Sequence, residues 1–446
     1  MSRILVTGTH SGCGKTTVTC AVLKALKDRG ISLSAFKCGP DYIDPMFHRR
    51  AVGVPSHNLD PFFSDRTQMN NQLAAKSGDL CLLEGAMGYY DGAGPDGLYS
   101  SYDVARETST PVTLVIDAKG LYASAGAILK GFLEYRDDSG IRGVIFNNAS
   151  PALYEGLSVI AERLGVKPLG FLPREPKAAV ESRHLGLMTA GEISDVEEKL
   201  TRLGDLAERY IDINGLLELA TAAPAIYTSN RARPEMKDYS VRIGVARDEA
   251  FCFFYEENME MLTELGCNME FFSPLNDNRL PGDISGLYLC GGYPELYAQA
   301  LSANDAMLNA VNAAIRGKMP AIAECGGFLY LHDTLDGSPM TGVIHADAYR
   351  TDKLVRFGYI TLRAGVDNLL CPAGRSIRAH EFHYYDSTDS GSGFIAQKPV
   401  SNRQWPCVHA TRTLYAGFPH LYFNANPAFC ENFIRKAVEY ESGKYT

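Results

Sequence analysis

Short apolar runs alternate with helix-like segments along the first half of the chain. Residues 3–7 form a β-rich run that ends in glycine, and residues 18–27 show helical spacing that stops at Gly30. Further apolar runs occupy 80–83, 112–116 and 143–146, and further helix-like segments occupy 123–135 and 153–164. Because runs that are apolar on both faces alternate with helices, this half predicts a parallel sheet with helices on both sides.

A second series of the same kind begins near residue 241. Residues 192–222 are helical and charged, and the polar, proline-containing stretch after them predicts a linker at 223–240. Strands are then predicted at 241–246, 286–290 and 320–324, with a helix at 255–265. We therefore predict an α/β protein of two domains, residues 1–222 and residues 241–446.

Composition and charge limit the classes of partner. The chain has 446 residues, of which 46% are hydrophobic and 21% charged, as in ordinary globular proteins. With 43 Lys+Arg against 52 Asp+Glu the formal net charge is −9, which predicts no basic surface for nucleic acid or an anionic membrane. Any negatively charged ligand therefore needs a local binding site.

The expected location is the cytoplasm. The N-terminal residues lack the charged, apolar and small-residue regions of a signal peptide. No apolar run reaches the roughly 18 residues that a membrane span needs. The eleven cysteines include no C-x-x-C pair and are interpreted as mostly small core residues of a reduced protein.

The run GTHSGCGKTT at residues 8–17 lies between the first predicted strand and the first predicted helix. Glycines let clustered backbone N–H groups approach a phosphate at the positive end of the helix dipole. The expected ATP-binding residues are Gly12, Gly14, Lys15, Thr16 and Thr17. Lys15 would reach the β- and γ-phosphates, and the Thr16 hydroxyl would ligate Mg²⁺. The alternative is a chance glycine-rich turn, which the flanking strand and helix disfavour.

Two acidic segments suit the same pocket. The run FKCGPDYIDP follows the predicted second strand, and LLEGAMGYYDG ends another strand. In doubly wound sheets ligands bind at the carboxyl ends of strands, so Asp41 and Glu84 would join Thr16 as oxygen ligands of Mg²⁺. Lys37 would stabilise charge on the transferring phosphoryl group. A helix cap or turn former is an equal alternative for each carboxylate alone, and the metal site is favoured for them jointly.

A candidate nucleophile occupies the second domain. The segment PAIAECGGFLYL places Cys325 between an apolar strand and a helix, where a sharp turn exposes a side chain and the helix N-terminus is expected to lower the thiol pKa. Most cysteines are core residues, but this context favours a reactive one. The backbone N–H groups of Gly291 and Gly292 would form an oxyanion hole. His420, in a strand-like run, would serve as general base and acid, with a structural histidine as the alternative.

The motifs together resemble the cobyrinic acid a,c-diamide synthase family over almost the whole chain. In order, they are GTHSGCGKTT, FKCGPDYIDPMFH, LLEGAMGYYDG, ESRHLGL, VARDEAFCFFYEEN, LCGGYPELY, ECGGFLYL and RAHEFHYY. The five residues between Gly8 and Gly14 resemble the loop of dethiobiotin synthetase, and His10 stands where positioning ATPases carry a signature lysine. The resemblance implies a P-loop NTPase-like synthetase domain followed by a class I (triad) glutamine amidotransferase-like α/β domain.

The resemblance also implies roles for single residues. Cys325 matches the glutaminase nucleophile and His420 the histidine that raises its reactivity. Purine-type amidotransferases carry a glutamate two positions after that histidine, where this chain has Tyr422, so the third triad member stays open. His380 and Glu381 are interpreted as part of a loop near the acceptor or on an interdomain surface, with structural packing as the alternative.

Three further contacts are implied by the resemblance. Asn147, at a strand end, would contact adenine, with a strand-ending turn as the alternative. Arg183 and His184 would contact the substrate. No nucleic acid or membrane partner is expected, and a homodimer is left open.

The implied activity is that of an ATP-dependent carbon–nitrogen ligase with L-glutamine as nitrogen donor. Cys325 would release ammonia from glutamine, while ATP with Mg²⁺, Lys15 and Lys37 would activate the c and a acetates of cobyrinic acid as acyl phosphates. Hydrogenobyrinate and nickel sirohydrochlorin carry the same acetates, so the macrocycle stays open. An alternative of another class is a regulatory or carrier P-loop ATPase with a degenerate glutaminase domain, which Cys325, His420 and His10 disfavour.

Overall fold

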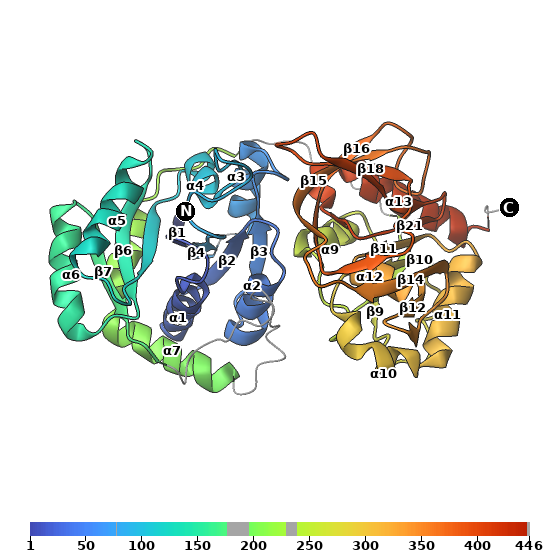
Figure 1. Ribbon diagram of the computed structural model, residues 1–446, viewed down its shortest axis with the longest axis horizontal. Helices are drawn as coiled ribbons and strands as arrows, with labels where there is room; N and C mark the ends of the chain where they lie inside the picture. Colours follow the sequence, from blue (N-terminus) through green and yellow to red (C-terminus); the bar gives the residue numbers. More distant parts are fainter. Residues whose placement is uncertain (77, 176–195, 229–238, 444–446) are drawn as a thin grey trace. The chain divides into compact units, whose positions relative to one another are not determined.

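The chain folds into two compact units, Met1–Asn230 and Arg231–Thr446. The computed structural model shown in Figure 1 describes residues 1–76, 78–175, 196–228 and 239–443. Most of the predicted linker at 223–240 lies outside these ranges, so the proposed domain boundaries stay a prediction.

The first unit is built on a parallel sheet with the order β3-β2-β4-β1-β5-β6-β7. Its strands are β1 (Ser2–Gly8), β2 (Leu33–Cys38), β3 (Ser56–Leu59), β4 (Leu80–Glu84), β5 (Val112–Asp117), β6 (Ile141–Asn147) and β7 (Lys167–Leu172). All neighbouring strands in it are parallel, as the continuous apolar runs predict. Because β1, β2 and β4 are adjacent, the segments that follow their carboxyl ends meet at one edge of the sheet.

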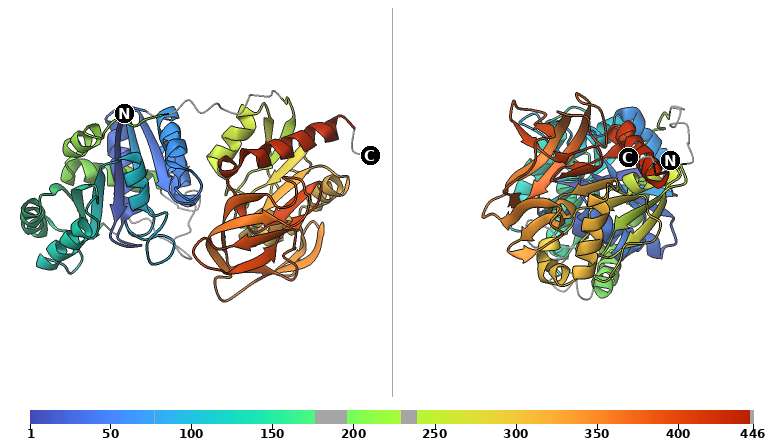
Figure 2. Two further views of the ribbon diagram at one scale, coloured as in Figure 1. Left: turned by 90° about the horizontal axis from the view of Figure 1, so that it is seen from above. Right: turned by 90° about the vertical axis from the view of Figure 1, so that its right-hand side faces the viewer.

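Helices lie on both faces of this sheet (Figures 1 and 2). Successive side chains of β1 point to opposite sides of the sheet. Ile4 belongs to a buried cluster with residues of α1, α7 and α8, whereas Leu5 belongs to a second cluster with residues of α3 to α6. The helices are α1 (Lys15–Asp28), α2 (Ile43–Met46), α3 (Arg66–Ala75), α4 (Ser101–Thr108), α5 (Ala123–Glu134), α6 (Pro151–Arg163), α7 (Val196–Tyr210) and α8 (Ile213–Thr221). The segment predicted as helical at 192–222 forms two helices over its described part, because Asp212 starts α8 by accepting the N–H of Gly215.

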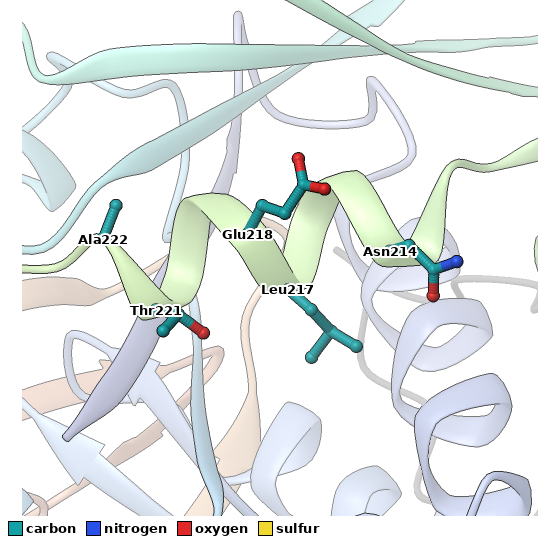
Figure 3. A pocket seen from close by; sticks show the side chains of 5 residues that line it. All are labelled: Asn214, Leu217, Glu218, Thr221 and Ala222. Carbon is teal, nitrogen blue, oxygen red and sulfur yellow. The ribbon is translucent and has the colours of Figure 1, made fainter.

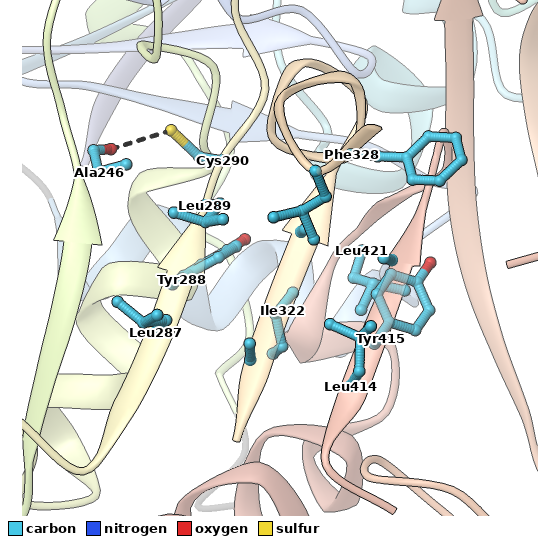
Figure 4. Close-up of a cluster of buried hydrophobic side chains, with 14 of the residues drawn as sticks. Ala246, Leu287, Tyr288, Leu289, Cys290, Ile322, Phe328, Leu414, Tyr415 and Leu421 are labelled. Atoms are coloured by element: carbon cyan, nitrogen blue, oxygen red, sulfur yellow. Dashed lines mark hydrogen bonds between the residues drawn. The ribbon is translucent and has the colours of Figure 1, made fainter. Parts of the chain in front are cut away.

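The main sheet of the second unit has the order β20-β21-β11-β10-β8-β9. Its strands are β8 (Arg242–Ala246), β9 (Asn268–Phe272), β10 (Gly286–Leu289), β11 (Ala321–Glu324), β20 (His409–Ala410) and β21 (Leu414–Gly417). The pairs are parallel except for β20 with β21. Figure 4 shows its buried side chains, among them Leu289, Ile322 and Tyr415.

Helices and two smaller sheets complete the second unit. The helices are α9 (Glu256–Glu264), α10 (Ala298–Ser302), α11 (Asp305–Arg316), α12 (Gly326–Tyr330) and α13 (Pro427–Glu441). The smaller sheets have the orders β13-β12-β14-β17 and β19-β18-β15-β16-β22. Their strands are β12 (His332–Leu335), β13 (Ser338–Pro339), β14 (Ile344–Arg350), β15 (Arg356–Ala364), β16 (Ser376–His383), β17 (Tyr385–Ser387), β18 (Phe394–Gln397), β19 (Gln404–Cys407) and β22 (His420–Leu421).

These smaller sheets matter for the site, because β22 pairs with β16 and so fixes the place of His420. All eleven cysteines lie in the described part of the chain, where they are buried and form no disulfide. Among the described helices, none combines the length and apolar character needed to cross a membrane.

Candidate active sites

The phosphate loop connects the end of β1 to the start of α1, as predicted. Gly14 precedes the helix with φ of 96°, and a Cβ added there would lie 2.0 Å from Nδ2 of Asn147. Only glycine fits both this conformation and this close approach. Gly14, the N-cap residue of α1, has no side chain to accept an N–H of the first turn, which leaves this helix end suited to an anion such as phosphate.

Lys15 and Asn147 both hold the loop in place. The ammonium of Lys15 donates to the carbonyl oxygen of His10 at 3.1 Å. The amide of Asn147 donates to the carbonyl oxygen of Cys13 at 3.0 Å. Burial lowers the pKa of Lys15, and a bound phosphate would restore the preference for its charged form. The structure thus brings Asn147 to the phosphate loop, and its contact with adenine stays a prediction.

A buried polar cluster lies beside the loop, at the ends of β2 and β4. The hydroxyl of Thr16 donates to Oε1 of Glu84 at 2.7 Å and lies 3.4 Å from Oδ2 of Asp44. The ammonium of Lys37 forms ion pairs with Asp44 and, at 3.2 Å, with Glu84. Lys37 belongs to β2 itself, so its predicted place after the strand is wrong. The strand holds its ammonium inside the cluster rather than on a loop.

The cluster contains two carboxylates and one lysine. Burial opposes ionisation of Glu84, but Lys37 and His48 hold its pKa below the usual value. Burial, and then Glu84, raise the pKa of Asp44 well above the usual value. Burial also opposes the charge of Lys37, yet Asp44 and Glu84 keep its pKa raised. A cation beside Asp44 and Glu84 would therefore favour the ionised form of both carboxyl groups.

The oxygen atoms of this cluster fit Mg²⁺, which prefers hydroxyl, carboxylate, phosphate and water ligands. Within the described residues, no group of three or more His, Cys, Asp or Glu side chains is arranged to hold a metal ion. Nucleotide phosphates and water would therefore have to complete the coordination, as is usual at phosphate loops.

Asp41, a predicted magnesium ligand, forms the turn before α2, and its binding of Mg²⁺ stays a prediction. Its Oδ1 accepts the N–H of Ile43 at 2.8 Å and that of Asp44 at 3.2 Å, immediately before α2. This is the turn-forming role that was the alternative for Asp41. Asp44 is the aspartate that the structure brings to Thr16.

His48 is a second residue that sequence reasoning missed. It lies in the π-helical segment Phe47–Val52, where its Nε2 contacts Oε2 of Glu84 at 2.9 Å and its Nδ1 contacts Oγ of Ser56 at 2.9 Å. These contacts orient the Glu84 carboxylate toward Thr16. Asp44 and His48 are four residues apart in sequence, a spacing that would have predicted one shared helical face.

In the second unit, Cys325 forms a sharp elbow between β11 and α12, as predicted. Its φ of 46° and ψ of −101° lie in a region that non-glycine residues rarely occupy. A Cβ added to Gly326 would lie 2.9 Å from the backbone nitrogen of Gly292. A Cβ added to Gly291 would lie 2.4 Å from Cε1 of His420. The turn at Cys325, the pair Gly291 and Gly292, and His420 therefore lie close together.

The environment of Cys325 does not lower its pKa. Burial, and then the Glu295 carboxylate, raise the pKa of this thiol, and the N–H of Gly326 offsets them only in part. The predicted lowering of the thiol pKa is therefore wrong, because the burial of the thiol outweighs the N–H at the start of α12. Formation of the thiolate then depends on a base that removes its proton.

The predicted oxyanion hole keeps one of its two donors. The N–H of Gly291 donates to the carbonyl oxygen of Phe253 at 3.1 Å, in a short antiparallel bridge. This contact occupies the Gly291 donor, which corrects its predicted role. The N–H of Gly292 lies next to the elbow and is the better candidate.

The segment RAHEFHYY is a strand in its larger part, so its interpretation as a loop is wrong. His380 and Glu381 belong to β16 and are buried. The rings of His380 and His420 stack with centroids 6.3 Å apart. Burial, and then His420, lower the pKa of His380, whereas burial raises the pKa of Glu381 to about 7. The predicted substrate residues Arg183 and His184 lie outside the described residues.

A shallow hollow of about 580 Å³ lies along α8 (Figure 3). It is lined by Asn214, Leu217, Glu218, Thr221 and Ala222. None of these belongs to the two sites described above, and their side chains do not form a reactive group.

Both halves of the chain match known family models. Residues 4–187 match the CobQ/CobB/MinD/ParA nucleotide binding domain, and residues 242–428 match the CobB/CobQ-like glutamine amidotransferase domain. A cobyrinate a,c-diamide synthase of Caldanaerobacter subterraneus is 37% identical, over 94% of this chain and 95% of its own length. The chain belongs to the cobyrinate a,c-diamide synthase family. Another member, from Clostridium acetobutylicum, is 35% identical over 98% of this chain and 100% of its own length.

Membership of this family extends beyond these two bacteria. A cobyrinate a,c-diamide synthase of Thermoplasma volcanium is 36% identical over 98% of both chains. The family is that of ATP-dependent glutamine amidotransferase ligases, so the two sites of the chain correspond to its nucleotide-binding and amidotransferase halves.

Proposed function

We propose that this protein amidates the c and a acetate carboxylates of cobyrinic acid, with ATP as energy source and L-glutamine as nitrogen donor. The observation that carries the proposal is the presence in one chain of a phosphate loop beside Thr16 and Glu84 and of a cysteine elbow at Cys325. Relatives matched over nearly their whole length are named for this activity. The cytoplasm is the proposed location.

In the glutaminase half, His420 takes the proton of Cys325 and the thiolate attacks the side-chain amide carbon of glutamine. The C–N bond breaks as His420 returns the proton to the leaving nitrogen, which departs as ammonia. The γ-glutamyl thioester is then hydrolysed by water to glutamate and the free thiol. The N–H of Gly292 would stabilise the negative oxygen of each tetrahedral intermediate.

In the synthetase half, an acetate carboxylate of the macrocycle attacks the γ-phosphorus of ATP, giving an acyl phosphate and ADP. The N-terminal N–H groups of α1 and Lys15 would bind the phosphates. The ammonium of Lys37 would balance the negative charge of Asp44 and Glu84. Mg²⁺, when bound, neutralises phosphate charge, and Thr16, Asp44 and Glu84 are the residues that would hold it. Ammonia then attacks the acyl carbon and phosphate leaves, which converts the acid into an amide.

The test is an amidation assay with three macrocycles. The protein is incubated with ATP, Mg²⁺ and glutamine and with cobyrinate, hydrogenobyrinate or nickel sirohydrochlorin, and acid-to-amide conversion is followed by mass spectrometry. Two successive conversions of cobyrinate are expected. Conversion of another macrocycle alone would correct the substrate, and ATP hydrolysis without any amide would favour a regulatory or carrier ATPase.

A further inference from the structure

The residue before the nucleophile faces the catalytic histidine. Oε2 of Glu324 lies 3.7 Å from Nδ1 of His420, and both side chains are buried, with 1% and 3% of their surface exposed. We propose that Glu324 is the positioning carboxylate of the glutaminase and completes a Cys325–His420–Glu324 triad. This inference deepens the proposed function, because it rests on glutamine hydrolysis at Cys325.

Two hydrogen bonds hold the Glu324 carboxylate in place. Its Oε1 accepts the N–H of Leu421 at 3.0 Å, and its Oε2 accepts the hydroxyl of Tyr288 at 3.2 Å. Asn258 donates to the carbonyl oxygen of Leu421 at 2.8 Å and accepts the N–H of Phe423 at 2.9 Å. The carboxylate and the strand that carries the histidine are therefore fixed relative to each other.

The backbone conformation of Cys325 explains how the consecutive residues Glu324 and Cys325 can both interact with the ring of His420. In a regular strand, successive side chains point to opposite faces of the sheet. The positive φ of Cys325 breaks this alternation at the end of β11, immediately after Glu324. Glu324 still lies in β11, and its side chain is buried. The thiol of Cys325 instead lies at the turn between β11 and α12.

Two other side chains near Glu324 and His420 carry no negative charge. Tyr422 occupies the position of the usual glutamate, and its ring packs edge-on against Tyr255. The His380 ring stacks on His420 and burial keeps it neutral, because its pKa lies well below the usual value. Among the described residues, the ion pair shown for His420 is the one with Glu324.

The geometry assigns a tautomer to the catalytic histidine. A carboxylate at Nδ1 favours the proton on that nitrogen, which leaves Nε2 to take the proton of Cys325. As the imidazolium forms, the charge of Glu324 stabilises it. A separation of 3.7 Å is longer than a hydrogen bond, and such contacts tighten when substrate binds.

The test compares two substitutions at one position. Glu324→Gln keeps the volume and the oxygen that accepts the N–H of Leu421 but removes the charge, whereas Glu324→Asp keeps the charge on a shorter side chain. Glutamine hydrolysis is measured as kcat and KM, and iodoacetamide alkylation reports the reactivity of Cys325. Amidation with added ammonium chloride reports the integrity of the other half. Tyr288→Phe is the matched control, because it removes a hydrogen bond from the same oxygen and keeps the charge.

We expect E324Q to lower the kcat of glutamine hydrolysis by about 100-fold or more, with KM changed by less than about threefold. Alkylation should slow in E324Q, ammonia-supported amidation should persist, and E324D should recover at least about a tenth of the original kcat. Equal kcat values for E324Q and E324D, or E324Q within about twofold of the unaltered protein, would overturn the triad. Lack of glutamine hydrolysis by the unaltered protein would instead contradict the proposed function.

Discussion

The hydroxyl of Thr16 donates to the carboxylate of Glu84 at 2.7 Å across 68 positions of sequence. The contact joins the first turn of α1 to the end of β4, directly beside the phosphate loop. A hydroxyl that would face a nucleotide-bound cation is thereby held against a buried carboxylate. Changes at this junction should therefore act on ATP-dependent amidation and leave the hydrolysis of glutamine intact.

Asp44→Asn should weaken the use of Mg²⁺ by the synthetase half. It removes a carboxylate that lies 3.4 Å from the Thr16 hydroxyl. We expect the Mg²⁺ concentration for half-maximal amidation to rise by about tenfold or more. Calorimetric titration of ATP with and without Mg²⁺ provides a readout that does not depend on turnover.

The matched control for this substitution is Asp41→Asn. The amide oxygen of asparagine can still accept the N–H groups of Ile43 and Asp44, so the turn before α2 should be kept. We expect a rise of less than about threefold in the same titrations. A larger effect of D41N than of D44N would restore Asp41 as the better candidate ligand.

Gly14→Ala should abolish most ATP binding. The residue has a φ of 96°, and the new Cβ would lie 2.0 Å from the Asn147 amide nitrogen, which holds the loop through Cys13. We expect the Kd of ATP to rise by at least about tenfold, since the strain alone costs of order 1–3 kcal/mol. Gly12→Ala has a similar φ but no atom within 4 Å of its Cβ, so it should bind ATP better than G14A. The reverse order would contradict the assigned packing.

Cys325→Ser should separate the two halves of the reaction. The serine hydroxyl is a much poorer nucleophile at this site than the cysteine thiolate, so glutamine-supported amidation should fall by at least about 100-fold. Amidation with added ammonium chloride should continue, because the synthetase residues are unchanged. Parallel assays with the two nitrogen sources, on protein with an unchanged circular dichroism spectrum, provide the measurement. Equal loss with both sources would contradict the proposed division of labour.

Glu381→Gln should change the pH dependence of stability in the second unit. Burial raises the pKa of Glu381 from 4.5 to about 7, so the folded state binds a proton that the unfolded state releases. The free energy of unfolding therefore falls as pH rises from 4.5 to 7, by about 3 kcal/mol in total. A glutamine side chain does not titrate, so E381Q avoids this loss. The free energy of unfolding of E381Q minus that of the unaltered protein should therefore be larger at pH 8 than at pH 4.5.

Trp405 allows this effect to be measured in the second unit alone. It is the single tryptophan of the chain and lies in β19. Urea unfolding followed by its fluorescence at pH 4.5 and pH 8 gives the two free energies for each protein. The same stability difference between E381Q and the unaltered protein at both pH values would refute the expected titration.

The parallel sheets were predictable because each strand and helix carries its own local pattern. The runs at 80–83 and 112–116 are β4 and β5, and both are apolar because helices cover both faces of the sheet. Most strands of the two smaller sheets, among them β14, β15 and β18, were not predicted. A strand such as β14 alternates buried and exposed residues over only seven positions, and its antiparallel partner β17 lies far away in sequence.

By itself, the sequence determined the phosphate loop and the Cys325 elbow, because in both the chemistry depends on consecutive residues at a strand-to-helix turn. The tertiary structure decided which distant groups meet there. It brought Asp44, rather than Asp41, to Thr16 and Glu84, and it placed Glu324 against His420. The physical reason is that sheet order sets these neighbours, and sheet order depends on how whole strands bury their apolar faces.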